Sequence, residues 1–213
     1  MAETGRRAGL RIRCPKGRGG STPPSRTVLT CGTKEIHTAT SRSRALRTLE
    51  EEHESVRELA ERLRDEDFER PATIGGGDWS PKDLLGHLTS WEEHALDALN
   101  AWRRGEPSPI QRAPRAHGLN AVNAENVAAD RDRSSPTVRR RFDDVHRRLV
   151  TKIRSMPDTT WDAPPTSRSR RSLGHVLGGI VGGPGGPFTH ASSHLSHLRA
   201  YVESVTDPGR PTP

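Results

Sequence analysis

The chain has 213 residues and a formal net charge of +7, and only 30% of its residues are hydrophobic and 4% aromatic. This length suits one domain of ordinary size. With 20 Gly, 17 Pro and 29% charged residues, part of the chain cannot bury enough apolar surface to fold. No apolar run approaches the roughly 18 to 20 residues that cross a bilayer, and the Arg- and Gly-rich N-terminus lacks the apolar region of a signal peptide. We therefore expect a cytoplasmic protein with no membrane partner.

The positive charge is concentrated at the N-terminus. Residues 1–45 hold ten Lys/Arg and two Asp/Glu, which gives a net charge of +8. Residues 46–213 hold 24 Lys/Arg and 25 Asp/Glu, which gives a net charge of −1. We interpret residues 1–41 as a disordered basic tail that could contact polyanions nonspecifically or serve only as a solvated extension. Both cysteines, Cys14 and Cys31, lie in it, so no disulfide framework or cysteine metal site supports the rest of the chain.

Amphipathic helices are expected in chain order from residue 42 onward. Apolar residues recur at three- and four-residue steps over about 42–65, and Ser80-Pro81 with Asp83 is typical of a capped helix start leading into a second helix that ends at 105–109. A short helix is expected at 118–129. Ser135-Pro136 then opens a third long helix over about 136–155. Another short helix at 173–181 precedes a Gly-rich segment, and a last helix spans about Pro187 to Ser204.

These elements predict an all-α fold, a four-helix bundle over residues 42–205 with one or two short connecting helices. Residues 206–213 are expected to be disordered. The Arg-rich side of the third helix, from Arg139 to Arg148, is interpreted as a solvated face, and no DNA-reading module is apparent, so we expect no specific nucleic-acid partner. A homodimer is a candidate oligomeric state.

Histidines supply the candidate chemistry. Among ten, His190, His194 and His197 stand at i, i+4 and i+7 in the last helix and so share one face, and His87 lies within the apolar stripe of the second helix. Two imidazoles at i and i+4 and a third from a facing helix can hold a divalent cation and leave a coordination position open. Zn or Ni suits such ligands, and Mn or Fe is possible with added water or carboxylate. The alternative is a set of hydrogen-bonded core histidines.

Other histidines, carboxylates and tryptophans could also contribute to a site. His53 and His94 are interpreted as core or boundary residues, and His146 as a surface or packing residue. Asp83, Glu92 and Glu93 could supply a carboxylate beside the metal or a general base, although helix capping for Asp83 and solvent exposure for the glutamates are the simpler interpretations. Trp79, Trp91 and Trp102 are expected chiefly to pack, and Trp91 could also form the wall of a pocket.

Three stretches of the chain resemble the DinB-like four-helix-bundle superfamily. They are DWSPKDLLGHLTSWEEHALDALNAWRRGE, NAENVAADRDRSSPTVRRRFDDVHRRLV and THASSHLSHLRAYVES, and the likeness is strongest to ClbS/DfsB-like or DinB-like bundles. The resemblance covers roughly residues 42–205. It implies a divalent metal bound by His87, His190 and His194. His197 replaces the usual Gln of the family, which leaves it as a hydrogen-bond donor to a metal ligand, a fourth ligand, a replacement ligand or a catalytic proton carrier.

The resemblance implies the first two of three candidate functions, and the third is the alternative to both. The first is a metal-dependent hydrolase or low-molecular-weight-thiol S-transferase, with a thiol such as mycothiol, that detoxifies electrophilic small molecules. The second is a metal-independent ring-opening hydrolase that gives self-resistance, in which carboxylates and His197 move protons. The third is a non-enzymatic bundle that binds a small molecule or a partner.

Overall fold

The computed structural model describes residues 40–75, 77–111, 118–164 and 171–206. The expected basic tail, apart from its last two residues, and the expected disordered C-terminus, apart from its first residue, lie outside this part of the chain. Regular secondary structure within it is helical, with two isolated β-bridges, Ile74 with Trp79 and Gly183 with Gly186. The all-α fold class is confirmed.

The helices follow one another in the order expected from the sequence, with three additional short turns of helix. Their bounds are α1 (Arg42–Glu61), α2 (Asp65–Phe68), α3 (Pro81–Arg103), the 3-10 turn η1 (Pro109–Gln111), α5 (Leu119–Ala128), α6 (Ser135–Arg154), α7 (Asp158–Trp161), α8 (Leu173–Ile180) and α9 (Ser192–Thr206). The predicted boundaries of the helices that became α3, α5, α6 and α8 agree with these to within about two residues.

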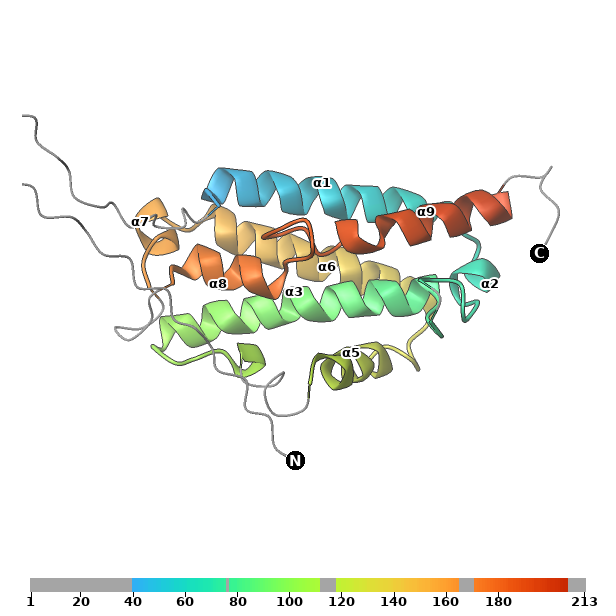
Figure 1. Cartoon of the computed structure of the whole chain (residues 1–213), viewed down its shortest axis with the longest axis horizontal. Coiled ribbons are helices and arrows are strands. Elements are labelled where there is room, and N and C mark those ends of the chain that lie inside the picture. Colours follow the sequence, from blue (N-terminus) through green and yellow to red (C-terminus); the bar gives the residue numbers. More distant parts are fainter. Residues whose placement is uncertain (1–39, 76, 112–117, 165–170, 207–213) are drawn as a thin grey trace, which may run out of the picture. The chain divides into compact units, whose positions relative to one another are not determined.

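Three long rods and one divided rod form the bundle. The helix α3 packs on α6, α5 and α8, while α1 packs on α6 and α9. Figure 1 shows α8 and α9 following one another along the bundle, with the Gly-rich loop between them. The fourth rod of the bundle is therefore interrupted at its middle.

The start of α3 forms as its sequence predicts. The Ser80 hydroxyl accepts a hydrogen bond from the backbone N–H of Asp83 at 3.1 Å, and the Asp83 carboxylate accepts one from the backbone N–H of Ser80 at 2.9 Å. This reciprocal capping box satisfies two donors that a helix end otherwise leaves free, and Pro81 begins the helix without needing a donor. The register of α3, and with it the direction of His87, is set from this end.

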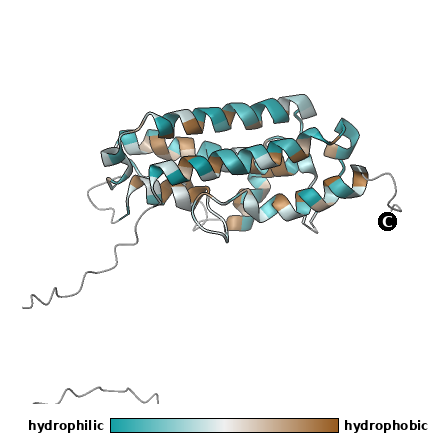
Figure 2. Cartoon of the chain, turned by 90° about the horizontal axis from the view of Figure 1, so that it is seen from above, coloured by the Kyte–Doolittle hydropathy of each residue, from teal (hydrophilic) through white to brown (hydrophobic). Residues whose placement is uncertain are grey.

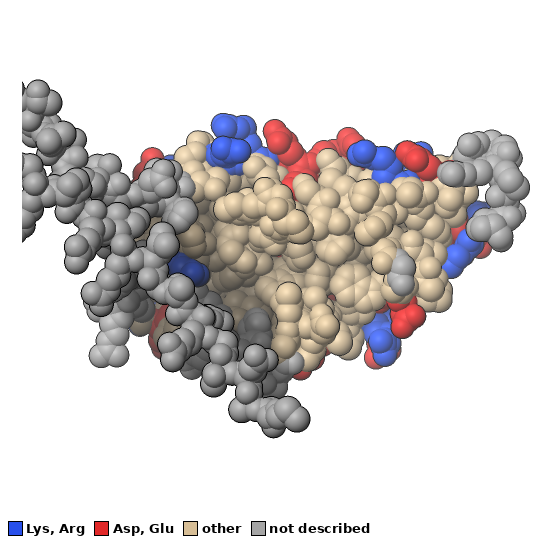
Figure 3. Space-filling model, in the orientation of Figure 1, with Lys and Arg blue, Asp and Glu red and all other residues tan. Residues whose placement is uncertain are grey.

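The core lies between the rods in two clusters. The first cluster contains Leu49, Ala95, Leu149 and Leu177, and the second contains Leu84. All five side chains are nearly or fully buried. Figure 2 shows hydrophilic and hydrophobic residues interspersed along each helix, as amphipathic helices require. On the face in Figure 3, many of the charged side chains lie along the edge where α1 runs. None of the described helices is both long and apolar enough to cross a bilayer.

Two predicted helix boundaries were wrong. The first helix ends at Glu61 rather than near 65, and its continuation is the separate turn α2. The last helix begins at Ser192 rather than near Pro187. Residues 187–191 are held instead by contacts to α8: the backbone N–H of Phe188, whose φ is +66°, bonds to the Gly178 carbonyl, and that of His190 bonds to the Val181 carbonyl. His190 therefore precedes the helix that carries His194.

Candidate metal centre

His87 lies on the inner side of α3 and is 2% exposed. It belongs to the same helical stripe as Leu84, Leu88 and Trp91, so the packing that buries this stripe also buries the imidazole. Burial, with a smaller contribution from His190 and His194, lowers the pKa of His87 to about 2, because the charged ring would be desolvated and would be repelled by a second positive charge. At neutral pH the ring is uncharged and offers a nitrogen lone pair.

His190 and His194 reach the same point from the start of α9. The Nε2 atoms of His87 and His190 lie 3.1 Å apart. The ring centroid of His194 is 5.4 Å from that of His87 and 5.5 Å from that of His190. Burial lowers the pKa of His190 to about 4 and also lowers that of His194, with repulsion among these rings and His197 adding to the effect.

These three histidines, here called the three-His cluster, have the composition of a cation site. One ring nitrogen from each lies within 4.8 Å of the other two. Two nitrogens bound tetrahedrally at about 2.0–2.1 Å from one ion are about 3.3 Å apart, close to the His87–His190 separation. The Nδ1 atom of His87 is buried and has no hydrogen-bond partner among the described residues. Neutral, desolvated imidazoles fit Zn or Ni, and three of them leave a position open.

Two tryptophans enclose the three-His cluster. The Trp79 ring centroid is 4.7 Å from that of His87 and 6.2 Å from that of His194, while Trp91 lies 5.7 Å from His190. The indole N–H of Trp91 donates to the Asn123 side chain at 3.3 Å. This hydrogen bond holds the N–H edge of the Trp91 ring toward α5. Both rings pack as expected, and they also form apolar walls around the imidazoles.

Glu52 of α1 holds the start of α9 in place. Its carboxylate accepts hydrogen bonds from the backbone N–H of Ser192, at 3.1 Å, and from the Ser192 hydroxyl. A carboxylate at a helix N-terminus satisfies free N–H groups and interacts favourably with the helix dipole. Burial raises the pKa of Glu52, and these hydrogen bonds oppose the rise. Because His190 and His194 flank Ser192, this contact from α1 sets where both rings lie.

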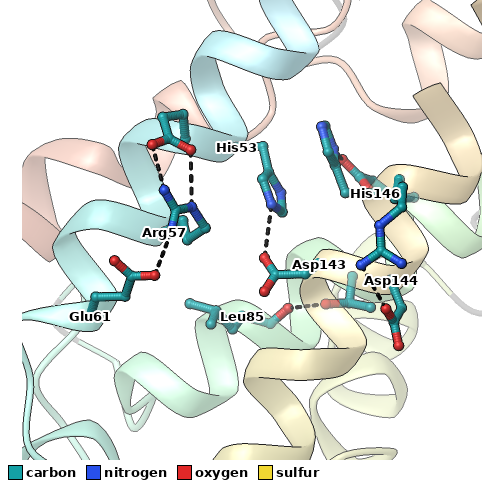
Figure 4. Close-up of polar contacts among 11 residues, drawn as sticks. His53, Arg57, Glu61, Leu85, Asp143, Asp144 and His146 are labelled. Atoms are coloured by element: carbon teal, nitrogen blue, oxygen red, sulfur yellow. Dashed lines mark hydrogen bonds and ion pairs between the residues drawn. The ribbon is translucent and has the colours of Figure 1, made fainter. Parts of the chain in front are cut away.

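A cavity opens beside His190. It is a narrow cleft, and Glu52, His53, Glu92, Phe142, Phe188 and His190 are among its lining residues. Behind this lining, the Glu92 carboxylate accepts from Nδ1 of His146 at 3.0 Å, and Nε2 of His53 lies 3.0 Å from the Asp143 carboxylate. Figure 4 shows His53 of α1 and His146 of α6 facing each other between these two helices. A polar pocket therefore adjoins the three-His cluster.

The remaining predicted site residues lie apart from the three-His cluster. His197 is exposed and lies against Gly75, where a Cβ would meet its Nδ1 at 3.3 Å. Asp83 is used in the capping box, and Glu93 forms an ion pair with Arg141. Glu92 is different, since its side chain is only 13% exposed. The expectation of solvent exposure was wrong for Glu92, because Glu92 lies one turn after Leu88 and therefore on the inner side of α3.

Three polar residues beside the cavity were not singled out as site residues from the sequence. Glu52 and His53 stand three and four residues after Leu49, in phase with Val56, so helical periodicity alone places them inward. His146 is 7% exposed and follows Phe142 by one turn of α6. Helical spacing therefore indicates that these polar side chains point inward. It does not indicate which residues of other helices they contact.

An all-helical bundle with histidines converging from α3 and the start of α9 defines the class of this protein as a DinB-like four-helix bundle. Residues 49–180 match the family described as the mycothiol maleylpyruvate isomerase N-terminal domain, and the chain belongs to that family of DinB-like bundles. The match includes His53, His87, Glu92 and His146. His190 and His194 lie beyond its end.

One solved structure shows the same fold. An uncharacterised protein from Escherichia coli UTI89 is similar with a TM-score of 0.62 and 13% sequence identity, over 76% of this chain and 93% of that chain. At this identity the similarity concerns the fold. No curated protein matches the chain.

Proposed function

We propose that the protein is a metal-dependent enzyme that acts on electrophilic small molecules, as a hydrolase or as a low-molecular-weight-thiol S-transferase in detoxification. The observation that carries this proposal is the convergence of three neutral imidazoles from α3 and the start of α9 within 4.8 Å. The family is related to mycothiol-dependent enzymes and to metal-binding DinB-like proteins, which favours mycothiol as the thiol.

The chain's own residues have separate roles in this proposal. His87, His190 and His194 would hold one divalent ion, Zn or Ni being the best match to three imidazoles. When bound, such an ion supplies Lewis acidity and lowers the pKa of a water or thiol at its open position. Trp79 and Trp91 limit the access of bulk water to the rings. A narrow cleft adjoins His190, and Oε2 of Glu92 in its lining has no hydrogen-bond partner among the described residues.

Metal stoichiometry tests the first step. Full-length protein prepared without a His-tag, loaded with Zn or Ni and then desalted, should retain about one ion per chain by elemental analysis. His190→Ala should retain close to none, since two imidazoles bind a cation much more weakly than three. His175→Ala is the matched control, because His175 is an exposed histidine of α8. Wild-type protein that retains no ion after loading would contradict the proposal.

Product analysis separates the two reaction classes. The loaded protein is mixed with a panel of reactive electrophiles, with and without a low-molecular-weight thiol. A hydrolase adds the elements of water across the broken bond, which either opens a ring or releases the leaving group with a proton, and it needs no thiol. A transferase forms a carbon–sulfur bond at the electrophilic carbon, breaks the bond from that carbon to the leaving group or ring atom, and passes the thiol proton to the released atom.

The cavity favours a second candidate, a metal-independent ring-opening hydrolase in which pocket carboxylates move protons. Glu52 and Glu92 both line the cavity, whereas His197, the other proposed proton carrier, is exposed. Activity that survives exhaustive chelation and is lost in Glu92→Gln would favour this candidate. Activity lost on chelation and restored by Zn or Ni would favour the metal-dependent enzyme. The third candidate, a non-enzymatic bundle that binds a small molecule or a partner, would be favoured by protein that is inactive toward the whole panel both with and without metal.

A further inference from the structure

The backbone makes a left-handed turn at Phe188, two residues before His190. The φ of Phe188 is +66°, and Ala72 is the only other described residue besides glycine with a positive φ. Residues with a Cβ rarely adopt this conformation, because the Cβ comes too close to the following carbonyl oxygen. Strained residues of this kind persist only where the surrounding structure holds them, and they are concentrated at functional sites. The contacts of Phe188 must therefore stabilise the turn.

The aromatic ring of Phe188 is held on α7 and α8. The side chain is 1% exposed, and its ring stacks on that of Trp161 with 5.8 Å between the centroids. Trp161 is fixed in turn, because its indole N–H donates to the Thr40 carbonyl at 2.9 Å. The Phe188 ring also lies against Gly178, where a Cβ would meet Cε2 of the ring at 2.9 Å and Cβ of Pro187 at 2.8 Å. This close approach of the ring to α8 therefore requires a glycine at position 178.

The strained turn directs His190 toward α3. The backbone N–H of Phe188 donates to the Gly178 carbonyl at 3.4 Å, and that of His190 donates to the Val181 carbonyl at 3.3 Å. Nε2 of His190 then lies 3.1 Å from Nε2 of His87. A helical conformation at Phe188 would reverse the sign of its φ and so redirect the residues that follow. The left-handed conformation is thus part of how the first histidine of this segment reaches the three-His cluster.

We infer that Phe188 is a positioning residue for His190. Its ring, packed on Trp161 and Gly178, stabilises the left-handed turn that presents the imidazole to His87. Burial of an aromatic side chain contributes free energy of the same order as one left-handed residue costs, so the ring offsets the strain. The inference rests on the proposed function only for the use of His190 as a metal ligand, and the position of the imidazole can be measured without metal.

Two adjacent glycines of α8 provide matched variants. Gly178→Ala directs a Cβ at the Phe188 ring, whereas a Cβ at Gly179 meets no described atom within 4 Å. Both substitutions add the higher helix propensity of alanine, so the contact with residues 187 and 188 distinguishes them. Phe188→Ala is a second variant, which removes the ring and keeps a Cβ at the strained position. Circular dichroism and thermal unfolding establish that each variant is folded.

The first measurement uses metal-free protein. Tag-free, full-length protein in a buffer with a chelator is treated briefly with diethyl pyrocarbonate, which acylates accessible neutral imidazoles. Peptide mass spectrometry gives the modification of His190 relative to that of the exposed His175. Gly178→Ala and Phe188→Ala should raise this ratio about fivefold or more, because loss of a stabilising contact shifts an equilibrium by such factors, and Gly179→Ala less than about twofold. A ratio that is unchanged in folded Gly178→Ala and Phe188→Ala would overturn the inference.

The second measurement uses Co(II), whose visible absorption reports the number and arrangement of its ligands. Gly178→Ala should bind Co(II) about tenfold or more weakly than wild-type protein, as is typical when a group that orients a metal ligand is disturbed, and its spectrum should change. Gly179→Ala should keep the wild-type affinity and spectrum. A contact that only stabilised the fold would change the melting temperature and leave the spectrum of the folded protein unchanged, which would also overturn the inference.

The two proposals fail separately. Wild-type protein that binds no ion, while Gly178→Ala raises the modification of His190, contradicts the proposed function alone. Wild-type protein that binds one ion, while Gly178→Ala keeps the same affinity, spectrum and His190 modification, contradicts this inference alone.

Discussion

Two groups of histidines lie near each other in this bundle, and their partners differ. In the three-His cluster a hydrogen bond joins one imidazole to another, His87 to His190. In the second group each ring has a carboxylate, His53 with Asp143 and His146 with Glu92. A carboxylate partner fixes a tautomer and uses a ring nitrogen, while rings that face one another can direct their lone pairs at a shared cation once each hydrogen is on the other ring nitrogen. The same residue type therefore suits cation binding in one place and hydrogen bonding to a carboxylate in the other.

Acidification should destabilise both groups and gives the largest expected effect. The pKa values of His53, His87 and His190 are lowered to about 3, 2 and 4, from an ordinary value of 6.5. The unfolded chain therefore binds more protons below pH 6.5, and stability falls as the pH falls. Between pH 7.5 and 5.5, each of these three histidines lowers the free energy of unfolding by about 1.4 kcal/mol, which makes about 4 kcal/mol for the three together.

Urea unfolding of metal-free protein at the two pH values measures this effect. His53→Phe should remove about one third of the pH dependence without changing its sign, which separates the second group from the three-His cluster. A free energy of unfolding that is equal at pH 7.5 and 5.5 would show that the imidazoles are not kept neutral by burial.

Metal should stabilise the protein through the three-His cluster alone. An ion that binds only the folded state stabilises it by about 2.7 kcal/mol at a free concentration of 100 times Kd. The melting temperature of wild-type protein should therefore rise with Zn or Ni concentration, and that of His87→Ala should not. His146→Ala is the comparison from the second group and should keep the metal-dependent rise, although its baseline melting temperature falls. Loss of the rise in His146→Ala as well would break the distinction between the two groups.

Glu52 should act on the three-His cluster through the start of α9, with a smaller effect on stability. Glu52→Gln keeps one acceptor for Ser192 and loses the charge, so we expect a loss of about 1 kcal/mol in the free energy of unfolding. Metal affinity should fall about tenfold, as it does when partners that orient metal ligands are removed. Glu51→Gln is the matched control, since Glu51 is its exposed neighbour on α1. Equal metal affinities in the two variants would show that Glu52 only supports the fold.

The helices and much of their register follow from contacts between residues close in the chain. Ser80, Pro81 and Asp83 define the start of α3 through contacts within four residues, and the spacing of Leu84, Leu88 and Trp91 defines its buried side. His87 is directed inward for the same local reason. Helical phase also directs Glu52 and His53 inward, although that phase was not used to assign them to a site. These features depend on contacts close in sequence, which a pattern of residues records.

The packing of the whole bundle sets where α9 begins and which partner each polar side chain contacts. His190 precedes α9 because Gly178 and Val181 of the preceding segment supply carbonyls to residues 188–190, and Glu52 caps the helix from 140 residues away. The pairing of Glu92 with His146, and the cavity shared by Glu92, His53 and His190, likewise join α1, α3, α6 and the start of α9. Helical periodicity specifies the side of a helix on which a residue lies. It does not specify which residue of another helix is opposite, because that depends on how all the rods pack together.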